Sequence, residues 1–406
     1  MQTPRPLAVS EAQERVLARF RRCSAEPTAL DPALGRTLAV DLLAASDLPS
    51  FTNSAMDGYA LRAADTIGAS GTTPLMLRVI GMQPAGAVAA PPVGQGEAVA
   101  ITTGAPLPVG ADAVARVEDT DGGAATMAIH RPLLPGTNVR RQGEVVRAGQ
   151  TLLNAGTRLD PGKIALLAAA GVAQPPVVRR PQVALLSTGD ELVPVGQPLR
   201  AGQIADANGP MLAALVAQYG GEAIPLGIAR DTPDDLRRIL SSVGDVALIV
   251  TSGGVSVGAH DAVRAVIAAQ GALDFWQVRM RPGRPVAFGH IGETPILALP
   301  GNPVAAFVAF HLLARPALAR MLGQSPEIPQ TVRVRLRATL ENRGAWQAYL
   351  HAAVVATSTG WDVAAVMEQG SGNVATLAAA KALIVIPEGI VNAPAGAMVD
   401  ALLLNG

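Results

Sequence analysis

The chain contains 406 residues, of which 49% are hydrophobic and 16% charged, and its formal net charge is +0. This length predicts several folded domains, and the composition excludes a disordered protein. Zero net charge and a low aromatic content of 3% argue against a nucleic-acid-binding surface. The single cysteine, Cys23, excludes an internal disulfide framework and a multi-cysteine metal site.

The sequence also argues against a membrane protein. Its N-terminal residues lack the apolar core of a secretory signal. Its apolar stretches, such as 164–173, are shorter than the roughly 20 residues that a helix needs to cross a bilayer. We therefore expect a cytoplasmic protein with neither a membrane partner nor a nucleic-acid partner.

The N-terminal half predicts helices around a small β region. Ser10 and Gln13 fit a capping box at the start of a first helix, and a second helix is expected at 31–43. Residues 48–140 are rich in Gly, Pro, Ala and Val, with short apolar runs between turn signals, which is typical of short strands. A helix is expected at 161–171, and a proline-rich run from 175 marks a linker.

Strand and helix patterns alternate after residue 181. Strands are predicted at 183–186, 223–228, 246–250 and 296–299. Four helices are predicted: one at 208–220, one that begins at 232, one that ends near 270, and one that follows 303. This alternation predicts a doubly wound α/β domain with a mainly parallel sheet. The alternating runs 332–340, 349–356 and 383–386 predict a C-terminal β domain.

Open parallel sheets bind ligands beyond the carboxyl ends of their strands, and three loops lie there. The loop 187–192 carries two acids and is either a solvated turn or a carboxylate site for Mg²⁺ beside a phosphate. The glycine-rich loop 251–258 is either an ordinary turn or a cradle of backbone N–H groups for an anion. His260, which follows it, is more typical of a surface histidine than of a ligand.

The third feature is a pair of arginines, Arg281 and Arg284, on a proline-stiffened loop. Two such side chains can grip a tetrahedral dianion with forked hydrogen bonds, although a rigid turn with two exposed arginines fits the same pattern. The stretch 299–303 could simply cap the next helix. We find no Ser-His-Asp order and no zinc motif.

Taken together, these motifs resemble the molybdopterin molybdenumtransferase family, which includes the E domain of gephyrin. The resemblance rests on 48–60, Thr103 to Ala105, 110–114 with Glu118, 187–192, 253–258 with Asp261, and 299–303, in the family's order and spacing. Each motif is short, but the joint pattern covers nearly the whole chain and is highly specific.

The resemblance implies α/β and β domains in an elongated homodimer. The implied domains are a discontinuous helical domain at 1–47 and 141–178, an inserted β domain at 48–140, an α/β molybdopterin-binding domain at 179–324 and a C-terminal β domain at 325–406. Each active site would lie between the α/β domain of one subunit and the N-terminal part of the other. The implied reaction uses adenylyl-molybdopterin and molybdate, with Mg²⁺, and releases AMP; the upstream molybdopterin adenylyltransferase is a candidate partner.

The resemblance also assigns site residues. The implied catalytic residues are Asp57, Asp190, Glu191, Asp231 and Asp261, with Asp190 and Asp261 as the Mg²⁺ ligands. The implied substrate-binding residues are Thr188, Gly189, Ser252, Gly253, Gly254, Ser256, Gly258, Arg281, Arg284, Pro285, Pro300, Asn302, Pro303 and Ser371. Arg281 and Arg284 stand where the family usually has lysines, so positive charge is kept while the geometry of anion binding changes.

Three positions depart from the family pattern. Val145, Ala305 and His351 replace a usual Asp, Ser and Arg, respectively. These changes leave open a tungstate preference or a diverged, non-catalytic scaffold. A nucleotide pyrophosphatase on a related α/β domain is a further alternative, although such proteins lack the segment around Asp57.

Overall fold

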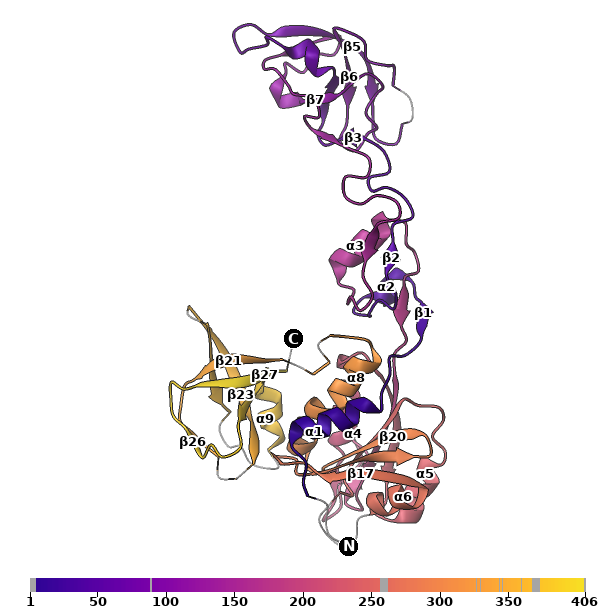
Figure 1. The fold of residues 1–406 in the computed structure, drawn as a ribbon, viewed down its shortest axis with the longest axis vertical. Coiled ribbons are helices and arrows are strands. Elements are labelled where there is room, and N and C mark those ends of the chain that lie inside the picture. The colour runs from indigo at the N-terminus through magenta and orange to yellow at the C-terminus, as the bar shows by residue number, and fades with distance from the viewer. Residues whose placement is uncertain are drawn as a thin grey trace.

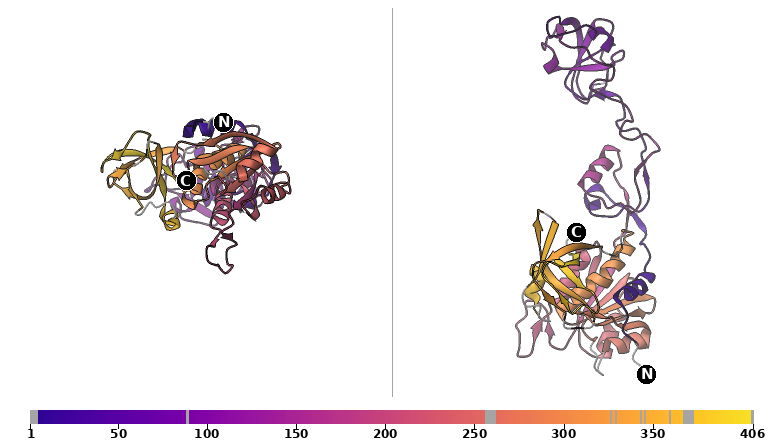
Figure 2. Two further views of the ribbon diagram at one scale, coloured as in Figure 1. Left: turned by 90° about the horizontal axis from the view of Figure 1, so that it is seen from below. Right: turned by 60° about the vertical axis from the view of Figure 1, so that its left-hand side comes forward.

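The computed structural model describes residues 5–87, 90–255, 262–325, 327–328, 330–342, 344, 346–358, 360–366 and 373–404. The molecule is elongated, with a β lobe at one end, a small middle lobe, and an α/β region with a C-terminal barrel at the other end (Figures 1 and 2). The multidomain α/β and β architecture predicted from the sequence is confirmed, while the predicted domain boundaries stay a prediction.

The α/β region is built on a six-stranded sheet in the order β15-β12-β16-β20-β19-β17. Its strands are β12 (Gln182–Thr188), β15 (Glu222–Ala229), β16 (Leu248–Ser252), β17 (Gly271–Gln277), β19 (Pro285–Ile291) and β20 (Thr294–Leu299). The first four strands in the sheet order are parallel, and β19 pairs antiparallel with both β20 and β17. The mainly parallel sheet is confirmed, but the antiparallel edge was not anticipated from the sequence.

Helices cover both faces of this sheet. They are α4 (Asn208–Gln218), α5 (Pro233–Leu240), α6 (Ala262–Gln270), α7 (Pro303–Ala309), η3 (Phe310–Ala314) and α8 (Arg315–Met321). Side chains alternate along β12: Val183 and Leu185 join the core with α4, α7 and α8, whereas Ala184 and Leu186 join the core with α5 and α6. This two-sided burial explains why the strands read as continuous apolar runs.

The 19-residue helical segment Pro303–Met321 is long and apolar enough to cross a membrane, with a mean hydropathy of 1.4 over an 18-residue window. No such stretch was expected from the sequence. In the structure 83% of that window is buried inside the protein, so the segment fills the core beneath the sheet rather than offering an apolar surface to lipid.

The first helix, α1 (Val9–Ala18), packs against η3 and α8 and shares the core of the α/β region. The predicted capping box is wrong: Ala8 is the N-cap residue, and Gln13 donates from its amide to the Leu312 carbonyl oxygen over 2.9 Å. Gln13 lies on the buried face of α1, so its amide serves tertiary packing rather than the helix end.

The middle lobe joins two distant stretches of chain. Strand β1 (Ala25–Pro27) pairs with β11 (Pro176–Val178), and β2 (Leu42–Leu43) pairs with β10 (Thr151–Leu153). Helix α3 (Pro161–Ala169) begins at Asp160, whose side chain accepts from the Lys163 backbone. The predicted helix at 31–43 is wrong, because α2 spans only Leu30–Ala33 before Gly35 takes a left-handed φ of 75°.

The β lobe, residues 53–140, confirms the predicted region of short strands. Its sheet has the order β7-β4-β6-β5-β8, with β3 pairing β9 beside it. The elements are β3 (Asn53–Ser54), β4 (Gly58–Leu61), η1 (Ala63–Thr66), β5 (Leu75–Gln83), β6 (Glu97–Ile101), β7 (Ala113–Arg116), η2 (Val117–Asp119), β8 (Thr126–Ile129) and β9 (Val139–Arg140). The lobe has its own core around Leu61, Met127 and Ile129.

The C-terminal strands close into a small barrel, in which β23 pairs with both β24 and β25. The elements are β21 (Thr331–Leu336), β22 (Leu340–Glu341), β23 (Gln347–Thr357), β24 (Gly360–Ala365), α9 (Val374–Ala379), β25 (Ala382–Ile386), β26 (Asn392–Ala393) and β27 (Met398–Leu403). A short strand from the α/β region, β18 (Met280–Arg281), pairs with β23 and joins the two regions.

Candidate functional site

A cavity of about 670 Å³ opens at the carboxyl ends of β12, β16 and β20, where the sequence predicted the ligand site. The loops after these strands form its walls, and Val374 at the start of α9 adds a contribution from the barrel side. Ten of the predicted site residues line it: Thr188, Glu191, Asp231, Ser252, Gly253, Gly254, Pro285, Pro300, Asn302 and Pro303.

The cavity wall contains buried polar atoms that a ligand would satisfy. Neither the Ser252 Oγ nor the Asn208 Oδ1 has a hydrogen-bond partner in the described part of the chain. Burying such an atom unpaired costs about 1–3 kcal/mol, so these atoms indicate a place where a polar ligand completes the network. The Asn208 amide nitrogen donates to the Gly301 carbonyl oxygen over 2.8 Å, which fixes its side chain beside the cavity.

Glycine is required at two positions of the loop after β16. Gly253 and Gly254 have φ values of 91° and 65°, in the left-handed region. A Cβ on Gly253 would lie 2.4 Å from the Thr188 carbonyl oxygen, and one on Gly254 would lie 2.6 Å from a Val263 methyl carbon. The loop backbone therefore packs directly against the end of β12. The predicted residues Ser256, Gly258 and Asp261 lie outside the described residues, as does His260.

Three carboxylates gather at the tip of β12. Glu191 and Asp231 line the cavity, whereas Gly189 and Asp190 line an adjoining cavity of about 530 Å³. The Asp231 backbone nitrogen donates to Asp190 Oδ1 over 3.4 Å. Burial raises the pKa of the Asp231 carboxyl, and the nearby Asp190 and Glu191 charges raise it further.

These carboxylates fit the chemistry of a hard divalent cation. Their oxygens are the donors that Mg²⁺ prefers, and a cation would relieve the mutual repulsion that raises the Asp231 pKa. Within the described ranges, however, no group of three acidic, histidine or cysteine side chains is close enough to form a ready-made metal cage. That fits an ion held by one or two carboxylates together with water and substrate oxygens.

The two predicted anion-binding arginines lie beside the cavity, not in its lining. Arg281 belongs to β18, and Arg284 precedes β19, whose first residue, Pro285, does line the cavity. Arg284 packs over the ring of Trp346, with its guanidinium carbon 4.6 Å from the ring centroid. Arg284 also donates hydrogen bonds to Gln277 Oε1. The sequence did not single out Gln277 or Trp346, because their contacts with Arg284 depend on the tertiary fold.

Asp57 lies between β3 and β4 of the β lobe, and this lobe lies at the opposite end of the molecule from the α/β region that holds the cavity (Figure 1). The Thr103 backbone nitrogen donates to Asp57 Oδ1 over 2.6 Å, and this bond holds the pKa of the carboxyl below its ordinary value. The side chain is exposed. Asp57 is therefore an ionised, outward-facing group that does not reach the α/β cavity of its own chain.

The three departures from the family pattern have different settings. Val145 is 64% exposed. Ala305 is buried in the first turn of α7, where its backbone nitrogen donates to Asn302 Oδ1 over 3.3 Å. His351 is buried in β23 and makes a hydrogen bond of 3.2 Å with Thr376 Oγ1, and burial lowers its pKa. Ser371 lies outside the described residues.

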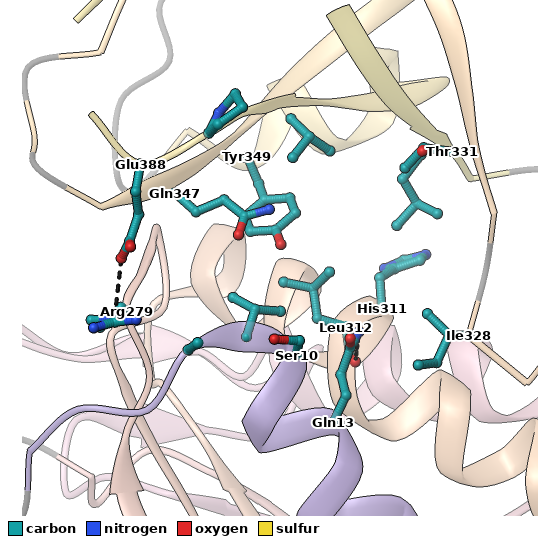
Figure 3. A pocket seen from close by; sticks show the side chains of 15 residues that line it. Ser10, Gln13, Arg279, His311, Leu312, Ile328, Thr331, Gln347, Tyr349 and Glu388 are labelled. Carbon is teal, nitrogen blue, oxygen red and sulfur yellow. Dashed lines mark hydrogen bonds and ion pairs between the residues drawn. The ribbon is translucent and has the colours of Figure 1, made fainter. Parts of the chain in front are cut away.

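A separate cavity of about 360 Å³ lies between α1, η3 and the barrel (Figure 3). An ion pair between Arg279 Nε and Glu388 Oε1, 3.1 Å apart, closes one side of it. Burial lowers the pKa of His311 to about 4, so this histidine is neutral at pH 7. None of the predicted site residues lines this cavity.

Three family profiles cover the chain in order. They are the MoeA N-terminal region (domain I and II) at residues 7–171, a probable molybdopterin binding domain at 184–320 and the MoeA C-terminal region (domain IV) at 331–404. The matches span all of the structural regions described above, including the β lobe and the barrel.

Full-length relatives agree with these profiles. Molybdopterin molybdenumtransferase 2 of Mycobacterium tuberculosis is 38% identical over 96% of this chain and 97% of its own length. The Staphylococcus aureus molybdopterin molybdenumtransferase is 34% identical over 98% and 96%, respectively. The crystal structure of a molybdopterin biosynthesis MoeA protein from Pyrococcus horikoshii superposes with a TM-score of 0.84 at 33% identity, covering 99% of this chain and all of that one. This chain therefore belongs to the molybdopterin molybdenumtransferase (MoeA) family.

Proposed function

We propose that this protein is a Mg²⁺-dependent molybdopterin molybdenumtransferase, which inserts molybdate into adenylyl-molybdopterin and releases AMP in molybdenum cofactor biosynthesis. The observation that carries the proposal is the cavity at the sheet ends, with its glycine-rich loop and the unpaired Ser252 and Asn208 atoms. Relatives that match over nearly the whole chain bear the transferase name.

The loop after β16 binds the phosphates of the adenylylated substrate. Its backbone follows the end of a strand, and the Ser252 hydroxyl is available to a ligand oxygen. Gly253 and Gly254 allow the backbone to lie close to Thr188, so phosphate oxygens can approach the N–H groups without a side chain in the way.

The carboxylates at the tip of β12 serve as the Mg²⁺ ligands and as the groups that exchange protons with the substrate. Asp190 and Asp261 would hold Mg²⁺, which would supply positive charge beside the pyrophosphate. Asp231 and Glu191 lie on the cavity side, where the raised pKa of Asp231 suits a group that exchanges a proton with a substrate oxygen. Arg281 and Arg284 hold the molybdate dianion.

The complete site is shared by two chains of a homodimer. Asp57 cannot reach the cavity of its own chain, and it is exposed and ionised in a separate lobe, as expected of a group offered to a second subunit. A dimer in which the β lobe of one chain covers the cavity of the other brings all the predicted residues together. We expect this homodimer in the cytoplasm, where an upstream adenylyltransferase supplies the substrate.

The direct test is release of AMP from adenylyl-molybdopterin by the full-length protein. We expect AMP to appear only when both molybdate and Mg²⁺ are present. Equal release without molybdate would favour a nucleotide pyrophosphatase. No release at saturating molybdate would overturn the enzymatic proposal and favour a scaffold.

A further inference from the structure

The oxyanion-binding loop lies where the α/β region meets the C-terminal barrel. Strand β18 pairs with β23 of the barrel, with Arg281 opposite Ala348. On the other side, the backbone nitrogens of Val278 and Val286 both donate to the Arg284 carbonyl oxygen over 3.1 Å. The backbone that carries both arginines is therefore held by two regions of the protein at once.

The side chain of Arg284 is held on one edge and one face. Its Nε and Nη2 donate to Gln277 Oε1 over 3.3 and 3.1 Å, and its guanidinium carbon lies over the ring of Trp346. These contacts use two of the five guanidinium N–H groups, which leaves three for a ligand. Neither Arg281 nor Arg284 makes an ion pair with an acidic side chain of the described residues.

A buried asparagine shapes the loop that presents Trp346. Asn342 is 4% exposed; its amide nitrogen donates to the Trp346 carbonyl oxygen over 3.1 Å, and its Oδ1 accepts from the Gly344 backbone over 3.3 Å. Its own backbone nitrogen donates to the Val391 carbonyl oxygen over 2.6 Å. Trp346 therefore sits on a loop anchored in the barrel, not on a free segment.

We propose that Trp346 and Gln277 are positioning residues for Arg284, so that the barrel sets the oxyanion affinity of the α/β site. Two unpaired positive charges on a short loop select a dianion, and a guanidinium already fixed in direction loses less side-chain freedom when the dianion binds. A lysine could not be held in this way, because stacking and a forked edge require the planar guanidinium. This inference rests on the proposed role of Arg284 in molybdate binding.

The test measures molybdate and tungstate binding to the full-length protein by calorimetry. We expect Trp346→Ala to weaken molybdate binding by between about two- and thirty-fold, the range of a cation–π contact, and Trp346→Phe to retain most of the affinity. Trp361→Ala is the matched control, because Trp361 is 54% exposed in β24 of the same barrel. That variant should bind like the wild type.

A second pair of variants keeps the test independent of folding. Gln277→Ala should weaken molybdate binding mildly, whereas Gln277→Glu should weaken it more, since a carboxylate would neutralise the charge of Arg284.

A double mutant tests whether Trp346 acts through Arg284. In an Arg284→Ala background, Trp346→Ala should cause no further loss of molybdate affinity, because the tryptophan acts only through the arginine.

The outcomes separate this inference from the proposed function. If the wild type binds neither molybdate nor tungstate, both the proposed function and this inference are overturned. If Arg284→Ala loses affinity while Trp346→Ala binds like the wild type, only the positioning role is overturned. A loss of affinity shared by Trp346→Ala and Trp361→Ala would likewise contradict it, because the effect would then be a general one on the barrel.

Discussion

The α/β region and the β lobe both carry acids that the sequence predicts as site residues, but the surroundings of these acids differ. Asp231 stands beside two other carboxylates at a cavity, and its pKa is raised; Asp57 is exposed, accepts a backbone hydrogen bond, and has a lowered pKa. One of the two cores of the α/β region also contains side chains of α1 and of the barrel, whereas the β lobe has a core of its own. The cavity is thus lined by the α/β region and the barrel side, whereas Asp57 lies in a separate lobe.

The largest expected effect on AMP release comes from substituting Asp57 in the β lobe. Asp57→Asn should reduce AMP release by about a hundredfold or more, the usual contribution of a positioned acid or base. Molybdate affinity should stay unchanged, because molybdate binding is assigned to Arg281 and Arg284 and not to Asp57. Parallel activity and calorimetry measurements check this, and a variant that keeps wild-type turnover would remove the β lobe from the mechanism.

Substituting the cavity loop should cost both stability and binding. Gly253→Ala combines a left-handed φ with a contact of 2.4 Å to the Thr188 carbonyl oxygen, and should lower the free energy of unfolding by about 1–3 kcal/mol. Urea unfolding and AMP binding measure the two effects. Gly292→Ala is the matched control, because its φ is +53° with nothing within 4 Å of the added Cβ; it should bind AMP normally.

The two acids should give opposite dependences of stability on pH. The folded-state pKa of Asp231 is raised, so the folded protein disfavours the ionised carboxylate. The resulting contribution to the free energy of unfolding is fully present below the unfolded pKa of about 3.9 and is lost as pH rises through the folded value. Asp231→Asn should therefore raise Tm at pH 7 and leave it unchanged near pH 3. Mg²⁺ should raise Tm more in the wild type than in the variant.

For Asp57 the sign is reversed. Its lowered pKa means that its contribution is present above about 3.9 and is lost as pH falls through the folded value, so Asp57→Asn should lower Tm at pH 7. Thermal melts of both variants across this pH range provide the measurement. Parallel pH profiles for the two variants would contradict the contrast between the two regions.

The smallest effect should come from the ion pair at the barrel junction. Glu388→Gln removes the partner of Arg279, but both side chains are partly exposed, at 43% and 26%, so the loss should stay below about 1 kcal/mol. Urea unfolding at low and high salt measures it, and the difference should vanish at high salt. A loss several times larger would mean that charge, rather than the shared apolar core, joins the barrel to the α/β region.

The sequence predicts best where the signal is local. The Thr232-Pro233 start of α5 and the Asn302-Pro303 start of α7 were readable because capping depends on a few adjacent residues, and both caps are present in the structure. The cavity loops were also found, because strand ends in a parallel sheet meet at one edge. By contrast, Ser10 resembled a cap, but tertiary packing placed the helix start at Ala8.

Contacts between distant segments could not be predicted in the same way. The pairing of β17 with β19 and the packing of Arg284 on Trp346 depend on how two regions meet, which no short pattern encodes. The sequence predicts a helix at 208–220, but not that the Asn208 side chain donates to the Gly301 carbonyl oxygen and lines the cavity. The distance of Asp57 from the cavity is likewise a property of the whole chain.

The central claim, that one site combines the cavity of one chain with Asp57 of another, can be tested with mixed dimers. One chain would carry Asp57→Ala and the other Asp190→Ala with Asp231→Ala, each with a different affinity tag, and the heterodimer would be purified through both. We expect inactive parents and a heterodimer that releases AMP at about half the wild-type rate, since one of its two sites is intact. A heterodimer as inactive as its parents would contradict it.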